Sequence, residues 1–173
     1  SASCLAHDLG NPPFGHSGEE AISTFFLEGK GNYLQTLVEA ENGRWSDFTC
    51  FEGNANSIRL LMHKFRGRRD GGFVMTYSTL ASIVKYPYSS ELKGGKNKFG
   101  FFESEENDYS RIADSLGIIK LNQSPLKFVR YPLVYLVEAA DDICYQIMDI
   151  EDAHKLNLVS TEKAKELFLG FFE

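Results

Sequence analysis

A chain of 173 residues, of which 43% are hydrophobic and 24% charged, is long enough to bury one substantial core within a single domain. No apolar run reaches the roughly 18 residues that a membrane span needs, and no signal peptide opens the chain, so we expect a cytoplasmic protein without a membrane partner. The net charge of −6 argues against nucleic-acid binding through global charge, although a local basic patch can still attract phosphates.

Apolar residues recur mostly at the i, i+3, i+4, i+7 spacing of amphipathic helices, and few segments alternate with a period of two. We therefore predict an all-α, mainly helical fold. The chain opens on a helix end that carries His7 and Asp8. The next helix should begin after His16, since Ser17 and Glu20 form a capping-box pattern ahead of an apolar run.

Further helices follow along the chain. The apolar pattern predicts them over residues 53–65, 78–85, 109–116, 132–153 and 161–172. Tyr86 precedes a proline and so ends the helix before it, while Gly117 is placed to end another in a left-handed conformation. Ser160 or Thr161 should start the last helix. Between residues 87 and 108, a Gly-Gly pair and alternating charges predict a surface loop or hairpin.

His7 and Asp8 stand side by side at the end of a helix, where both can reach one ion placed beyond it. A neutral imidazole and a carboxylate together suit Mg, Mn, Fe or Zn. Ligands of this kind need partners from elsewhere in the fold. The structural alternative is that His7 bonds a backbone carbonyl and Asp8 caps a turn.

His16 and Glu19 form a second candidate pair. Pro12 and Pro13 stiffen the link from the first pair, so His16 returns at a fixed position. His16 and Glu19 are three residues apart and lie on one helix face, where a carboxylate orients an imidazole and favours its protonated form. His16 can then act as a general acid. The alternative is a solvated, charged first turn.

A polar stripe follows one side of the longest predicted helix. Glu138, Asp141, Tyr145, Asp149 and Asp152 recur there at spacings of three and four, on a helix that is otherwise mostly apolar. Such a helix should be largely buried, and buried carboxylates are costly unless they are paired or bound to metal. The pattern favours a stripe that lines a cavity over a plain solvated face.

Four blocks of the sequence resemble one known family. "CLAHDLGNPPFGHSGE", "FEGNANSIRLL", "IVKYP" and "YLVEAADDICY", in that order, are similar to the bacterial deoxyguanosine triphosphate triphosphohydrolases (dGTPases) of the HD-domain superfamily. The resemblance implies an HD-type helical core and a divalent metal held by a His, a His-Asp pair and a later Asp. His7, Asp8 and Asp141 match the last three.

The first histidine of that pattern has no match in this chain. We therefore expect residues 1–173 to be a single HD-type domain from a longer protein, without its N-terminal ligand histidine and its C-terminal part. The metal implied is Mg²⁺ or Mn²⁺, with Fe, Zn, Co or Ni also compatible with such ligands.

The resemblance also implies roles around a nucleotide. His16 and Glu19 match the family's catalytic pair, and Tyr145 and Asp149 match the groups that recognise the deoxyribose 3'-hydroxyl. Nucleotide contacts are implied for Asn54, Lys85 and Tyr86, with Lys85 at the triphosphate. The reaction implied is hydrolysis of dGTP, or of another dNTP, to the deoxynucleoside and inorganic triphosphate. The family further implies a homo-oligomer with single-stranded DNA or a nucleotide as effector.

Two other functions remain open at this stage. Another HD-type phosphohydrolase, acting on nucleoside monophosphates or cyclic dinucleotides, would use the same metal residues. A non-catalytic module would instead bind nucleotide or single-stranded DNA through the basic cluster of Arg66, Arg68 and Arg69. A basic helix end is, however, more often simply solvated.

Overall fold

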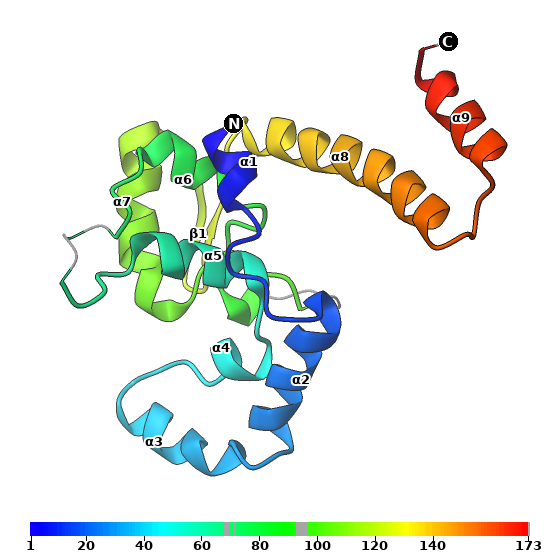
Figure 1. Cartoon of the computed structure of the whole chain (residues 1–173). Helices are drawn as coiled ribbons and strands as arrows, with labels where there is room; N and C mark the ends of the chain where they lie inside the picture. The colour runs from blue at the N-terminus through cyan, green and yellow to red at the C-terminus, as the bar shows by residue number, and fades with distance from the viewer. Residues whose placement is uncertain (68–69, 71, 93–96, 173) are drawn as a thin grey trace. The chain divides into compact units, whose positions relative to one another are not determined.

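The computed structural model describes residues 1–67, 70, 72–92 and 97–172 (Figure 1). The chain forms two compact units, Ser1–Val134 and Tyr135–Glu173. Helices predominate in both, which confirms the mainly helical fold class. The prediction of one HD-type domain over the whole chain stays a prediction.

The first unit holds most of the secondary structure. Its α-helices are α1 (Ala2–Ala6), α2 (Gly15–Leu27), α3 (Gln35–Ala40), α4 (Ser46–Thr49), α5 (Gly53–Met62), α6 (Tyr77–Ile83) and α7 (Glu106–Leu116). Short 3-10 helices are η1 (Asn32–Leu34), η2 (Ser90–Leu92) and η3 (Glu103–Glu105). Strands β1 (Lys120–Gln123) and β2 (Leu126–Phe128) form an antiparallel hairpin. The sequence pattern did not predict this hairpin, nor α3 and α4.

The core of the first unit lies among α5, α6, α7 and β2, which Figure 1 shows grouped together. Ile58, Tyr109 and Phe128 are among its fully buried side chains. Phe101 stacks on Tyr109, with ring centroids 4.8 Å apart. This core fixes the position of α5, whose first residues support the candidate site.

The start of α2 differs from the prediction. The helix begins at Gly15, and its N-cap is Phe14, whose side chain has no polar atom to cap a helix. Phe14 and Gly15 both have positive φ, 67° and 54°, so the chain turns into the helix immediately after the two prolines. Ser17 already lies inside the first turn, and the predicted capping box with Glu20 is therefore wrong.

Of the segment 87–108, the structure describes residues 87–92 and 97–108, and these are not the surface loop that the sequence predicted. Phe99 and Phe101 are fully buried, and α7 begins at Glu106, earlier than its apolar pattern indicated. Acidic residues in the first turn of α7 concealed its start, although carboxylates favour the N-terminus of a helix. The Gly-Gly pair, Gly94 and Gly95, lies outside the described residues.

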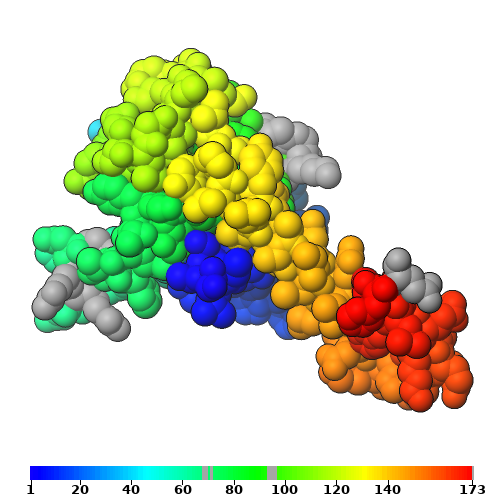
Figure 2. Space-filling model, turned by 90° about the horizontal axis from the view of Figure 1, so that it is seen from above, coloured from blue at the N-terminus to red at the C-terminus, as the bar shows by residue number. Residues whose placement is uncertain are grey.

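The second unit consists of α8 (Val134–Lys155), which starts at the unit boundary, α9 (Thr161–Leu169) and η4 (Gly170–Phe172). The Ser160 hydroxyl caps α9 by accepting the Lys163 N–H at 3.2 Å, as predicted. Val134 is buried, whereas most other side chains of α8 are half-buried or exposed (Figure 2). The prediction of a largely buried helix is thus wrong for the described residues, since Val134 is the one buried side chain of α8.

Candidate active site

The turn between α1 and α2 is held against α5. The Gly10 N–H donates to Oγ of Ser57 at 2.9 Å, and Ser57 donates to the carbonyl of His7 at 2.7 Å. The side chain of Asn56 donates to the Gly10 carbonyl at 2.9 Å. A Cβ on Gly10 would lie 2.2 Å from the Ser57 nitrogen, so only glycine permits this close approach. The backbone that follows His7 and Asp8 is therefore fixed by α5.

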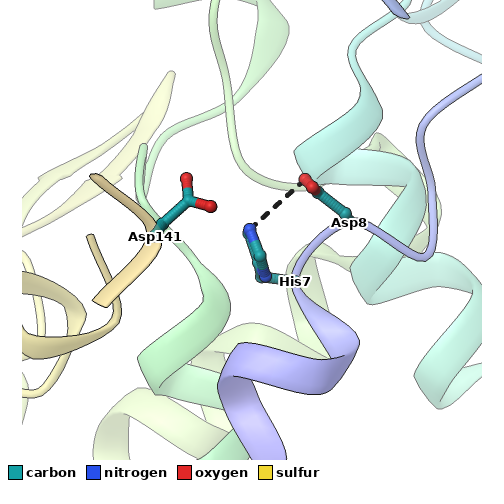
Figure 3. Close-up of side chains that lie close together, drawn as sticks. All are labelled: His7, Asp8 and Asp141. Carbon is teal, nitrogen blue, oxygen red and sulfur yellow. Dashed lines mark ion pairs between the residues drawn. The ribbon is translucent and has the colours of Figure 1, made fainter. Parts of the chain in front are cut away.

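The His7 ring is oriented by its own helix. Nδ1 lies 2.8 Å from the Cys4 carbonyl, which only accepts hydrogen bonds, so Nδ1 carries a proton. In the neutral ring the lone pair is then on Nε2, and Nε2 lies 3.4 Å from Oδ1 of Asp8 (Figure 3). Two such acceptors side by side are stabilised by a shared cation or by protonation of the ring.

Asp8 is positioned in turn by Asn11, whose side-chain amide donates to Oδ1 at 2.9 Å. The hydrogen bonds from His7 to the Cys4 carbonyl and from the Asn11 amide to Asp8 are those expected if both residues had only a structural role. They are also the outer-shell hydrogen bonds that usually orient metal ligands. The donor set of His7 and Asp8 therefore fits a divalent metal.

The structure brings His16 and Glu19 together. Nδ1 of His16 lies 3.0 Å from Oε2 of Glu19, both on the first turns of α2. The His16 side chain is 87% exposed, whereas that of Glu19 is 13% exposed. The carboxylate thus anchors a ring whose Nε2 side faces outward, available to a bound molecule.

Two residues that sequence reasoning missed complete this cluster. Nζ of Lys98 donates to Glu52 at 2.6 Å and to Glu19 at 3.3 Å. Glu52, 1% exposed, caps α5 by accepting the N–H groups of Asn54 and Ala55. Its position just before a helix was a visible signal, whereas Lys98 is 79 residues from Glu19 and gave none.

The charge state of Glu19 follows from these contacts. Partial burial raises the pKa of Glu19, but the Gly53 N–H, at 2.7 Å, the His16 hydrogen bond and the charge of Lys98 outweigh it, and the pKa lies below its ordinary value. Burial lowers the pKa of Lys98, yet its hydrogen bonds to the two glutamates raise it above the usual value. Glu19 and Lys98 are accordingly ionised at neutral pH.

A hollow of about 510 Å³ opens beside the pair of His16 and Glu19. Glu20, Ser23, Thr24 and Lys98 also line it, so its walls carry an imidazole, a cation, hydroxyl groups and two carboxylates. The exposed imidazole of His16 can transfer a proton to a molecule bound there.

Of the residues with predicted nucleotide contacts, Asn54 belongs to the cluster around Glu19 and Glu52. The side chain of Asn54 donates to Oε1 of Glu52 at 2.8 Å, so it belongs to the same hydrogen-bond network. Nζ of Lys85 lies 5.8 Å from the ring centroid of Tyr86, and both side chains are half-buried. Of the basic cluster, Arg66 is exposed, and Arg68 and Arg69 lie outside the described residues.

Asp141, Tyr145 and Asp149 all lie on α8 in the second unit. Their spacing of four places them along one side of the helix, as the stripe predicted. Asp141, also labelled in Figure 3, is half-buried, while Tyr145 is 50% exposed and Asp149 is exposed. Their roles as ligand and sugar contacts stay predictions.

Curated proteins similar to this chain are named as triphosphohydrolases of deoxyguanosine triphosphate or as proteins like them. The "deoxyguanosinetriphosphate triphosphohydrolase-like protein" of Pseudomonas aeruginosa is 43% identical over 98% of this chain. That of Synechocystis sp. is 40% identical over 88% of the chain. A Yersinia enterocolitica protein named "deoxyguanosinetriphosphate triphosphohydrolase" is 33% identical over 92%.

The resemblance to the dGTPase family is thereby confirmed by homologues that cover nearly the whole chain. The chain spans 38% of the length of the Pseudomonas aeruginosa relative. No family model matches the sequence. Within the described residues, no helix is long and apolar enough to cross a membrane.

Proposed function

We propose that this chain contributes the active site of a metal-dependent deoxynucleoside triphosphate triphosphohydrolase. Its substrate would be dGTP or another dNTP, and its products the deoxynucleoside and inorganic triphosphate. The observation that carries the proposal is the anchored pair of His16 and Glu19, which follows the oriented pair of His7 and Asp8 on one rigid turn. Homologues that bear the name of this activity support it.

In this proposal His7, Asp8 and Asp141 hold the divalent metal, Mg²⁺ or Mn²⁺. The bound metal would neutralise charge on the α-phosphate and lower the pKa of a water molecule. The support is chemical. Nε2 of His7 and a carboxylate oxygen of Asp8 lie side by side. The Cys4 carbonyl orients the His7 ring, and the Asn11 amide orients the Asp8 carboxylate.

His16 would protonate the leaving 5' oxygen. Its Nδ1–H donates to Glu19, which leaves Nε2 on the exposed side of the ring to hold the proton that is transferred. Glu19 stays ionised because of Gly53, His16 and Lys98, so it stabilises the charged form of the ring without taking its proton. The residues of this chain thus supply the acid and its orientation.

Substrate contacts complete the proposal. Lys85 would bind the triphosphate, and Asn54 and Tyr86, in the same unit, would also contact the nucleotide. Tyr145 and Asp149 would contact the deoxyribose 3'-hydroxyl from α8. Exposed apolar side chains on that helix, such as Leu136 and Ile143, support a homo-oligomer. We also propose a cytoplasmic location, and single-stranded DNA or a nucleotide as effector near Arg66.

The decisive experiment uses the full-length protein with Mn²⁺ and dGTP, and it identifies the products by chromatography. Equimolar deoxyguanosine and inorganic triphosphate are expected. Pyrophosphate with a monophosphate, or cleavage of monophosphates or cyclic dinucleotides alone, would assign the site to a different HD-type phosphohydrolase. Binding without turnover in the presence of each metal would favour the non-catalytic module.

A further inference from the structure

The hairpin of β1 and β2 is joined to the segment that follows Lys85. The Phe128 N–H donates to the Pro87 carbonyl at 2.8 Å, and the Ser89 N–H donates to the Leu126 carbonyl at 3.2 Å. Tyr88 and Lys127 form an antiparallel bridge between these two bonds. Residues 87–89 therefore extend the hairpin by a third, short extended segment. β2 therefore lies beside residues 87–89, from which it is separated by about 40 residues in the sequence.

Side chains along β2 point alternately into the core and toward solvent. Leu126 and Phe128 are buried in the core, whereas Lys127 between them is exposed. Nζ of Lys127 lies 5.9 Å from the ring centroid of Tyr88. The Tyr88 ring packs edge-to-face with Tyr86, at a centroid distance of 6.3 Å.

Lys85 completes the arrangement at the other end, with its Nζ 5.8 Å from the Tyr86 ring. The result is a row of cation, ring, ring and cation, in the order Lys85, Tyr86, Tyr88 and Lys127. Packing of each ammonium on an aromatic face restricts the long lysine side chain, so less conformational entropy is lost when an anion binds.

The row lies close to the cluster around Glu19. Tyr88 packs against the buried cluster of Cys50, Ala55, Phe99 and Phe102, and Ala55 lies in the first turn of α5, which the glutamate that binds Lys98 caps. Two negatively charged glutamates already occupy Lys98. Lys127, in contrast, projects from the hairpin toward solvent and is better placed to meet an incoming anion.

We propose that Lys127, supported by the ring of Tyr88, is a second phosphate-contacting residue that acts together with Lys85 on the triphosphate of the substrate. This inference rests on the proposed function, because it deepens the triphosphate contact assigned there to Lys85. A triphosphate carries its charge along a chain of three groups, so cations at two places along a row match it better than one. Lys127 contributes to binding and has no role in proton transfer.

The test measures binding of inorganic tripolyphosphate, as well as turnover, in the full-length protein. Calorimetry in Mg²⁺ buffer at low salt is expected to give a dissociation constant about tenfold higher for Lys127→Met than for the wild type, the effect of losing one charge-assisted contact. Lys127→Arg should restore most of the affinity. In turnover assays, Lys127→Met should raise KM for the dNTP by a similar factor and leave kcat nearly unchanged.

Lys120 provides the matched control on the same hairpin. Its Nζ lies 5.5 Å from the Phe128 ring, and it is exposed like Lys127, but it bonds Gln123 and is not part of the row. Lys120→Met should leave both constants unchanged. Equal effects of the two methionine variants would mean that only the general field of the hairpin matters and would overturn the proposal. So would wild-type affinity in Lys127→Met, or no binding of tripolyphosphate to the wild type.

The binding experiment separates this inference from the proposed function. If the protein binds tripolyphosphate in a Lys127-dependent way but releases no triphosphate from any dNTP, the cation row stands and the proposed reaction fails. If triphosphate is released normally by Lys127→Met with unchanged KM, the reaction stands and the role of Lys127 fails.

Discussion

Nδ1 of His16 lies 3.0 Å from Oε2 of Glu19, and the other oxygen of the same carboxylate accepts the N–H of Gly53 at the start of α5. The catalytic candidate on α2 is thus tied to a helix whose far side is in the core of the unit. Its orientation is set by this contact between α2 and α5.

Glu19→Gln should reduce kcat by about 100-fold and change KM little, since an amide holds the His16 ring less firmly and does not stabilise its charged form. Gln retains an oxygen for the Gly53 N–H, so the fold should persist by circular dichroism. Glu28→Gln, an exposed residue at the C-terminal end of the same helix, is the control and should stay near wild-type activity. Comparable losses in the two variants would contradict the assigned role of Glu19.

The pH dependence of stability should carry the signature of Glu19. Its pKa lies below the ordinary value of 4.5, so the folded state gains stability from the ionised form above that value. This contribution is lost as the pH falls through the lowered pKa of the folded state. Denaturant unfolding of wild type and Glu19→Gln should therefore differ by a constant amount between pH 7 and about 5, and the difference should shrink in more acidic buffer. A difference that grows on acidification would have the wrong sign.

Gly10→Ala should destabilise the protein by about 1–3 kcal/mol, the usual cost of overpacking. The added Cβ would lie 2.2 Å from the Ser57 nitrogen and 2.3 Å from the Gly53 carbonyl oxygen, and backbone cannot rotate away. Gly170→Ala is the control, because its Cβ would meet nothing within 4 Å. Chemical unfolding measures both. If the two substitutions cost the same, the close approach of the turn to α5 is not a constraint.

Metal content should separate the two pairs of the site. His7→Ala should lose most of the bound Mn²⁺, because the substitution removes the nitrogen ligand and leaves only the Asp8 carboxylate on this turn. His16→Ala should retain the metal while its turnover is abolished. Elemental analysis after gel filtration, alongside the activity assay, gives both readouts. Metal loss from His16→Ala as large as from His7→Ala would refute the division of roles.

Chelation provides a related test on the unmodified protein. Excess EDTA should abolish turnover, and added Mn²⁺ or Mg²⁺ should restore it, since the bound cation would supply charge neutralisation that no side chain replaces. Binding of inorganic tripolyphosphate through Lys85 and Lys127 should weaken less than turnover. Full activity in EDTA would exclude the assigned metal dependence.

Local features of the chain were predictable because their causes lie within a few residues. Gly117 ends α7 with a φ of 66°, which glycine adopts without steric cost, and Ser160 caps α9 through an N–H three residues away. The pairs His7–Asp8 and His16–Glu19 were visible for the same reason. The start of α2 was not, because the left-handed turn at Phe14 has no common sequence signature.

The sequence by itself determined the helical class, the candidate pairs and the family resemblance, because periodicity, capping and short motifs are written in neighbouring residues. The tertiary structure alone decided that Lys98 joins Glu19 and Glu52, that Phe101 is buried, and that Tyr88 pairs with Lys127. These contacts join residues dozens of positions apart. They form only when burial of the whole core offsets the entropy of closing such long loops, and no local pattern records that balance.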